Sequence, residues 1–334
     1  MRDGDENVDK GEGDAPRSED WLGNLGAGAI AAMGAGVFAL SILGMIAIDR
    51  IGGALTAGAA PVRIVAPEVE GVAFEMPATD LAVVASRGRA PAWRLHGAAF
   101  EAPADRPLMA IVVLDDGTRS DAAMGALDWD APLSFAIAAD FDLSPHRIER
   151  VRRAGREALA LVPFGYGPDL GGDPNVLRRG LGEAELLRRL RWHLARAGDG
   201  IVGVVDHHAG DLVRDVDMLR IVGGGLVDEG MLTIDSRGDA RSLLSASLRP
   251  MGVPVGRGRA RIGRDDARDA VFEKLADADQ YARTWGTAIV TVEAGEETMA
   301  SLAAWIQARG QDVLLAPVSH VVRRLRRGLQ ATDD

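Results

Sequence analysis

The sequence of 334 residues contains no cysteine, which excludes disulfides and thiolate metal sites. A net charge of -11 argues against nucleic acid as a partner, because phosphate contacts need clustered Lys and Arg. Arginines do cluster within residues 147–156 and 178–196, but their helical spacing among acids and leucines is typical of solvated helix faces. A nucleophile elbow, a P-loop and a dinucleotide fingerprint are also missing from the sequence. The hydrophobic content of 47% permits a substantial core.

Charged residues are absent from residues 21–48, and a span of about 20 apolar residues crosses a bilayer. We therefore expect one transmembrane helix there, rather than a cleaved signal peptide, which normally has a basic start and a shorter apolar core. A buried soluble helix of this length without charges would be unusual. Flanking charges do not decide the orientation, since basic residues lie on both sides.

Composition divides the rest of the chain into four parts. Residues 1–20 are acidic and polar, which predicts a disordered N-terminus. Residues 49–106 are rich in Ala, Pro and Gly, which indicates a flexible tether. A folded domain is expected over residues 107–325, followed by a short tail over 326–334.

Short apolar runs alternate with helical patterns through the folded domain. Continuous apolar runs are typical of buried parallel strands, and alternation of strands with helices predicts a parallel α/β sheet with barrel-like closure. Strands are expected at 109–114, 133–138, 158–162, 201–205, 231–234, 288–292 and 313–316. Helices are expected at 120–127, 145–154, 183–197, 212–227, 240–248, 266–284 and 297–308. Three adjacent glycines at 223–225 predict a break in the fourth helix.

Three of the predicted strands end in residue types that bind metals, and α/β proteins place their chemistry at such ends. The first ends in Asp115-Asp116-Gly117. Two adjacent carboxylates repel each other, which predicts either a bound cation between them or separate roles, one as a metal ligand and the other as a general base. The alternative is a loop start in which an Asp caps the next helix.

Two further strand ends and one acidic segment complete this set. Asp206-His207-His208 follows the fourth strand, and at most one of the two histidines is expected to face a site. Asp235-Ser236-Arg237 follows the fifth, where Arg237 would orient a carboxylate unless the pair is a surface turn. Glu293 could add an oxygen ligand.

These ends resemble those of the divergent polysaccharide deacetylase family. The resemblance covers roughly residues 107–325 and depends on the order of several motifs along the chain. They are Ile111-Val112-Val113-Leu114-Asp115-Asp116, Pro174-Asn175-Val176-Leu177 with Gly180-Leu181, Gly203-Val204-Val205-Asp206-His207, and the Asp-Ser-Arg at 235–237.

The resemblance implies a distorted seven-stranded (β/α) barrel with a metal-dependent hydrolytic site. By it, Asp115 would be the general base, and Asp116 and His207 would bind a divalent metal such as zinc, which activates water. Asp206, His208, Asp235, Arg237 and Glu293 would line the site. The sequence departs from the family where members carry a His and a Glu around a Pro, since Leu161 and Gly165 flank Pro163 here. It also has Glu293-Ala294-Gly295 in place of a His-Pro-His segment.

Two hypotheses follow from the sequence. The first is a single-pass protein of the cytoplasmic membrane whose extracytoplasmic or periplasmic domain removes N-acetyl groups from cell-envelope glycans. The second is a catalytically degenerate barrel that binds glycan or serves envelope assembly. The missing histidines favour the second hypothesis, and the family name favours the first.

Overall fold

The computed structural model describes residues 90–139, 143–165, 174–207, 210–238 and 240–333. The predicted transmembrane segment 21–48 lies outside the described residues, as do the acidic N-terminus, most of the tether and His208. Within the described ranges, no helix is long and apolar enough to cross a membrane.

Nine strands form one sheet in the described part of the chain, and every neighbouring pair is parallel. Their order is β6-β5-β4-β3-β2-β1-β8-β7, with β9 paired beside the start of β1. The strands are β1 (Leu108–Asp115), β2 (Ser134–Ala138), β3 (Glu157–Pro163), β4 (Ile201–His207), β5 (Leu232–Asp235), β6 (Val255–Arg257), β7 (Ala260–Ile262), β8 (Thr287–Glu293) and β9 (Leu314–Leu315).

The two ends of this strand path are consecutive in the sequence. Strand β6 pairs with β5, and β7 begins three residues after β6 ends and pairs with β8. The change of partner falls at Gly258 and Arg259, whose backbone N–H groups donate to the oxygens of Asp235 and Ile289 at 2.8 and 2.7 Å. The sheet therefore curls back on itself, which confirms the parallel, barrel-like α/β class.

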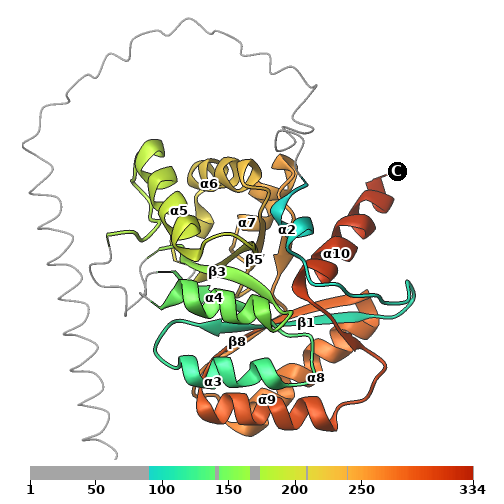
Figure 1. Ribbon diagram of the computed structural model, residues 1–334. Helices are drawn as coiled ribbons and strands as arrows, with labels where there is room; N and C mark the ends of the chain where they lie inside the picture. The colour runs from blue at the N-terminus through green and yellow to red at the C-terminus, as the bar shows by residue number, and fades with distance from the viewer. Residues whose placement is uncertain (1–89, 140–142, 166–173, 208–209, 239, 334) are drawn as a thin grey trace, which may run out of the picture. The chain divides into compact units, whose positions relative to one another are not determined.

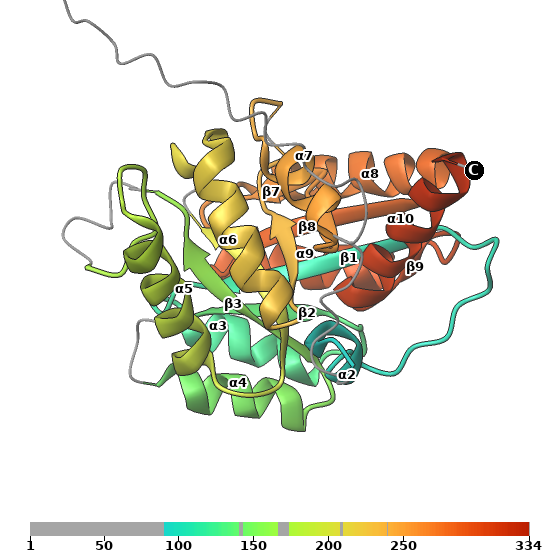
Figure 2. The same cartoon turned by 90° about the horizontal axis from the view of Figure 1, so that it is seen from above.

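Seven helical regions follow the strands, close to the predicted positions, and cover the outer face of the sheet. Helices α5 and α6 lie side by side in both views (Figure 1, Figure 2), and α3, α8 and α9 gather beside β1 and β8. They comprise α3 (Ser120–Gly125) with η1 (Ala126–Asp128), α4 (Ser144–Arg153), α5 (Glu183–Ala197), η2 (Leu212–Arg214) with α6 (Val216–Asp228), α7 (Leu244–Leu248) with η3 (Arg249–Met251), α8 (Arg268–Trp285) and α9 (Glu296–Ala308).

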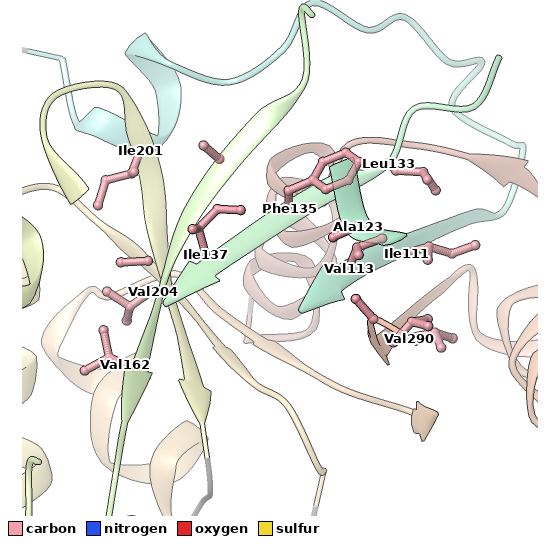
Figure 3. Close-up of a cluster of buried hydrophobic side chains, with 14 of the residues drawn as sticks. Ile111, Val113, Ala123, Leu133, Phe135, Ile137, Val162, Ile201, Val204 and Val290 are labelled. Atoms are coloured by element: carbon pink, nitrogen blue, oxygen red, sulfur yellow. The ribbon is translucent and has the colours of Figure 1, made fainter. Parts of the chain in front are cut away.

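Alternate residues of β1 pack into two separate apolar clusters, which explains its continuous apolar sequence. Met109, Ile111 and Val113 join the cluster under the outer helices, part of which Figure 3 shows. Leu108 and Val112 point to the opposite face, where α2 (Ala92–Leu95) and α10 (Val318–Asp333) cover the sheet. Residues 326–333, expected as a tail, continue α10.

The predicted break at residues 223–225 is wrong, because α6 runs through all three glycines. A Cβ at Gly223 would lie 2.6 Å from Leu248 Cδ2, and one at Gly225 would lie 2.8 Å from Leu190 Cδ2. Two of the three glycines therefore let α6 pack closely against its neighbours on either side.

A buried carboxylate, that of Glu157, lies at the amino ends of the strands and connects β3 with the segment after α2 and with α10. Glu157, 1% exposed at the start of β3, accepts hydrogen bonds from the N–H groups of Ala98 and Ser319, both at 3.0 Å. The hydroxyls of Ser319 and Ser134 donate to the same carboxylate. Burial raises the pKa of Glu157, while these hydrogen bonds oppose the increase.

Candidate functional site at the carboxyl ends of the strands

The carboxyl ends of the strands carry the predicted site residues on one edge, because all the strands run in the same direction. Asp115 ends β1, His207 ends β4, Asp235 ends β5 and Glu293 ends β8. Glu293 is in register with Leu114 of the neighbouring β1. We call this region the carboxyl edge.

Asp115 is buried and fixes the turn that leaves β1. Its Oδ1 accepts from the Gly117 N–H at 2.9 Å and from the Ser120 hydroxyl at 2.7 Å. Gly117 has φ of +88°, a backbone conformation that favours glycine, and it lets the chain turn sharply here. Oδ2 lies 3.8 Å from Arg147 Nη1 of α4. Asp115 therefore holds the loop that leads from β1 to α3, with an arginine as its charge partner.

Asp116 is held by a threonine and an arginine. Its Oδ1 accepts from the Thr118 N–H at 3.0 Å and hydroxyl at 2.7 Å, and its Oδ2 pairs with the Arg264 guanidinium. Burial raises the pKa of Asp116, but the hydrogen bonds from Thr118 and Arg264 outweigh it and lower the pKa overall. The carboxylate is therefore ionised and already balanced by a cation that the chain itself supplies.

Arg264 reaches Asp116 from the end of β7, and Gly295 makes room for it. A Cβ at Gly295 would lie 2.4 Å from the Arg264 backbone oxygen and 2.8 Å from its Cγ. The Thr298 hydroxyl of α9 donates to the same oxygen at 2.5 Å. Gly295 stands where the family is expected to carry the end of a His-Pro-His segment, so the arginine occupies space next to that position.

A second arginine connects three strand ends. Arg261 of β7 donates to Glu293 Oε1 at 2.6 and 2.8 Å and to the Ser236 hydroxyl at 2.7 Å. The Ser236 N–H in turn donates to Oδ1 of the fully buried Asp206. Burial and then the charge of Asp235 raise the pKa of Asp206 to about 7, against the opposing effects of Ser236 and Arg261.

The remaining predicted residues are placed as follows. His207 is 8% exposed, and its backbone oxygen accepts from the Phe164 N–H of the neighbouring segment at 3.0 Å. Asp235 is buried, and its Oδ1 accepts from the Gly238 N–H at 3.1 Å. Arg237 is exposed, whereas the guanidinium that meets the carboxylates is that of Arg261.

Arg261 and Arg264 were not among the predicted site residues. Strand β7 is three residues long and has an arginine at its centre, so no apolar run marks it. Arg264 is 148 residues from Asp116 in the sequence, and no local pattern connects the two.

The described residues at the carboxyl edge do not fit the divalent metal that the family resemblance implies. Among the described residues, no group of three or more His, Asp or Glu side chains could hold a metal ion. Arg264 and Arg261 bind the carboxylates of Asp116 and Glu293, so they occupy oxygens that a metal would need.

Leu161 and Gly165 stand beside Pro163 where family members are expected to carry a His and a Glu, and neither position offers a metal ligand. Leu161 is buried in the apolar cluster under α2 and α10. Gly165 has φ of +117°, and a Cβ there would lie 2.8 Å from the Gly210 Cα. A larger side chain at position 165 is therefore excluded unless the backbone moves.

Fold and edge together define a parallel, barrel-like α/β domain with polar residues at its carboxyl edge. The sequence profile of the divergent polysaccharide deacetylases matches residues 111–322, and the chain belongs to this family. A search of curated proteins finds no match.

Several solved structures are similar to this chain. An uncharacterized protein from Agrobacterium tumefaciens is 22% identical with a TM-score of 0.63, and the match covers 71% of this chain and 97% of that one. A peptidoglycan N-acetylglucosamine deacetylase catalytic domain from Eubacterium rectale is 11% identical with a TM-score of 0.41, covering 66% and 93%. A mutant of a CE4 family pseudoenzyme with restored activity is 11% identical with a TM-score of 0.43, covering 66% and 69%.

Proposed function

We propose that this chain is a non-catalytic member of its family that binds a glycan at the carboxyl edge without a catalytic metal. The observation that carries the proposal is the ion pair between Arg264 and Asp116. A deacetylase of the expected kind would need the Asp116 carboxylate for a metal, and here a guanidinium holds it.

The exposure of the edge residues supports a binding role. The side chains of Asp116, Arg264 and Glu293 are 23, 28 and 27% exposed, and that of Arg261 is 13% exposed. The edge therefore presents charged donors and acceptors that reach solvent, and charge-assisted hydrogen bonds to such groups are the stronger ones. Sugar hydroxyls can both donate and accept, so they match this mixed set.

The test compares three measurements on the full chain with a pentamer of N-acetylglucosamine as probe. We expect no stoichiometric zinc, no release of acetate, and measurable binding of the pentamer by calorimetry. Arg261→Gln and Glu293→Gln should each weaken binding of the pentamer. Arg220→Gln, on the exposed face of α6 with a side chain 66% exposed, should leave the affinity unchanged. Stoichiometric zinc that is lost in Asp116→Asn, together with acetate release, would establish the hydrolase hypothesis instead.

We further propose that residues 21–48 anchor the chain in the cytoplasmic membrane with the folded unit on the extracytoplasmic side. The support is the absence of charge from this segment and, for the orientation, the family's association with glycans. Carbonate extraction of membranes and protease accessibility of intact and permeabilised cells would test it. A chain lacking residues 21–48 is the control, and release of the full chain by carbonate would exclude the anchor.

A further inference from the structure

A cavity of about 400 Å³ lies where the chain changes from β6 to β7. Strand β6 pairs with β5, and β7 pairs with β8 from Val290 onward, so residues 287–289 at the start of β8 have no β7 partner. The cavity occupies this gap, between η3 and the end of α8. Its walls include Arg249, Arg257, Arg259, Tyr281, Trp285 and Leu325. We call it the switch pocket.

Two of its arginines lack an acidic partner among the residues that the structure describes. Arg257 Nη2 donates to the Gly238 oxygen at 2.8 Å, and Arg249 Nη2 donates to the Val255 oxygen at 3.3 Å. Arg259, by contrast, pairs with Asp277 at 2.7 Å. Burial, followed by the charge of Arg257, lowers the pKa of Arg249. The pocket thus holds an uncompensated pair of like charges in a protein of net charge -11.

Two aromatic residues at the end of α8 form the outer wall of the switch pocket. Trp285 is 70% exposed and Tyr281 is 39% exposed, and their ring centroids lie 6.2 Å apart with an interplanar angle of 37°. Arg259 lies 5.1 Å from the Tyr281 ring centroid and so fixes that ring beside the charges. An exposed indole offers a flat apolar face with a polar edge, which suits the C–H face of a sugar ring.

We propose that the switch pocket binds an acidic sugar, with its carboxylate at Arg249 and Arg257 and its ring on Trp285. A guanidinium fork matches the geometry of a carboxylate and would relieve the repulsion between the two arginines. The cavity volume falls within the range of small-molecule sites. None of the side chains proposed to hold the sugar belongs to the carboxyl edge, so this site goes beyond the proposed function.

The test measures binding of trigalacturonate to the full chain by calorimetry and by tryptophan fluorescence. Its fully methyl-esterified form has the same rings without the charges and is the matched ligand control. We expect trigalacturonate to bind one to one and the ester to bind at least tenfold more weakly. Binding should weaken with rising salt, because the contact is between charges.

Variants separate the pocket from the rest of the surface. Trp285→Ala and Arg257→Gln alter exposed side chains, so both variants should keep the melting temperature of the parent. Each should weaken the binding of trigalacturonate at least tenfold. Arg153→Gln, on α4 with a side chain 77% exposed, should leave it unchanged. Equal affinity for acid and ester, an undiminished affinity in Trp285→Ala, or displacement of the sugar by inorganic phosphate at equal concentration would overturn the proposal. Arg261→Gln, which tests the carboxyl edge, should not affect trigalacturonate.

Discussion

The backbone oxygen of Arg264 lies against Gly295, where a Cβ would come within 2.4 Å of it. Both residues help to form the carboxyl edge, since the side chain of the same arginine pairs with Asp116. The lack of a Cβ at 295 and the position of Arg264 are therefore coupled, because Gly295 leaves the space that the backbone oxygen and Cγ of Arg264 occupy. This coupling gives the first prediction.

Gly295→Ala should destabilise the fold by about 1–3 kcal/mol, because the overlapping atom is backbone and cannot rotate away. Gly182→Ala is the matched control. Both glycines are N-cap residues with extended backbone, of α9 and α5 respectively, but nothing lies within 4 Å of a Cβ at Gly182. Urea denaturation of the two variants measures how much free energy of unfolding the overlap costs. Equal losses in both variants would contradict the predicted overlap at Gly295.

Asp206→Asn should flatten the dependence of stability on pH. Since burial raises the folded-state pKa of Asp206 to about 7, the folded protein binds more protons than the unfolded chain between about pH 4 and pH 7. The free energy of unfolding should therefore fall as pH rises through that range, by up to roughly 4 kcal/mol from this residue.

Asparagine keeps an oxygen for the Ser236 N–H but carries no charge, so the variant should be more stable than the parent at pH 8 and lose that advantage at pH 4.5. Urea denaturation at several pH values provides the measurement. Glu157 remains in both proteins, so the difference between them excludes its contribution. Parallel curves for parent and variant would show that Asp206 does not titrate in this range.

The three glycines of α6 should respond differently to alanine. Gly224→Ala should stabilise the protein by about 0.5–1 kcal/mol, because nothing lies within 4 Å of the new Cβ and alanine favours a helix. Gly223→Ala should cost about 1–2 kcal/mol despite the same helix preference, because its Cβ would overlap Leu248 and Met251. Thermal unfolding of both variants measures this contrast, and stabilisation by both would refute the close packing of α6.

Ser319→Ala should destabilise the protein by about 1–3 kcal/mol, because it removes a hydroxyl that donates to the buried Glu157 carboxylate. Ser245→Ala serves as control, since its buried hydroxyl has no hydrogen-bond partner in the part of the chain that the structure describes. We expect the control to be neutral or slightly stabilised in urea denaturation. A similar loss of stability in both variants would mean that the Ser319 hydroxyl does not stabilise the buried Glu157 carboxylate.

The sequence predicts the long strands of this fold well and the short ones poorly, for a physical reason. All eight residues of β1 are buried, so its pattern is unmistakable. Strands β6 and β7 have three residues each and therefore no apolar run. Strand β6 ends in the exposed Arg257, and β7 directs Arg261 into the carboxyl edge. The site follows the same rule: Asp115, Asp116, Asp206 and Asp235 come directly after predictable strands. Arg264 and Arg261, which pair with Asp116 and Glu293, come from the missed region.

The carboxylate of Glu157 has a consequence for how the chain is made. Its partners Ala98 and Ser319 are 59 residues before it and 162 residues after it. During synthesis from the N-terminus, β3 therefore emerges after Ala98 and Ser134 but long before Ser319, which donates to the carboxylate from its backbone N–H and its hydroxyl. Until α10 has left the ribosome, the inner face of the sheet lacks the part of its cover that α10 supplies, although α2 is already present.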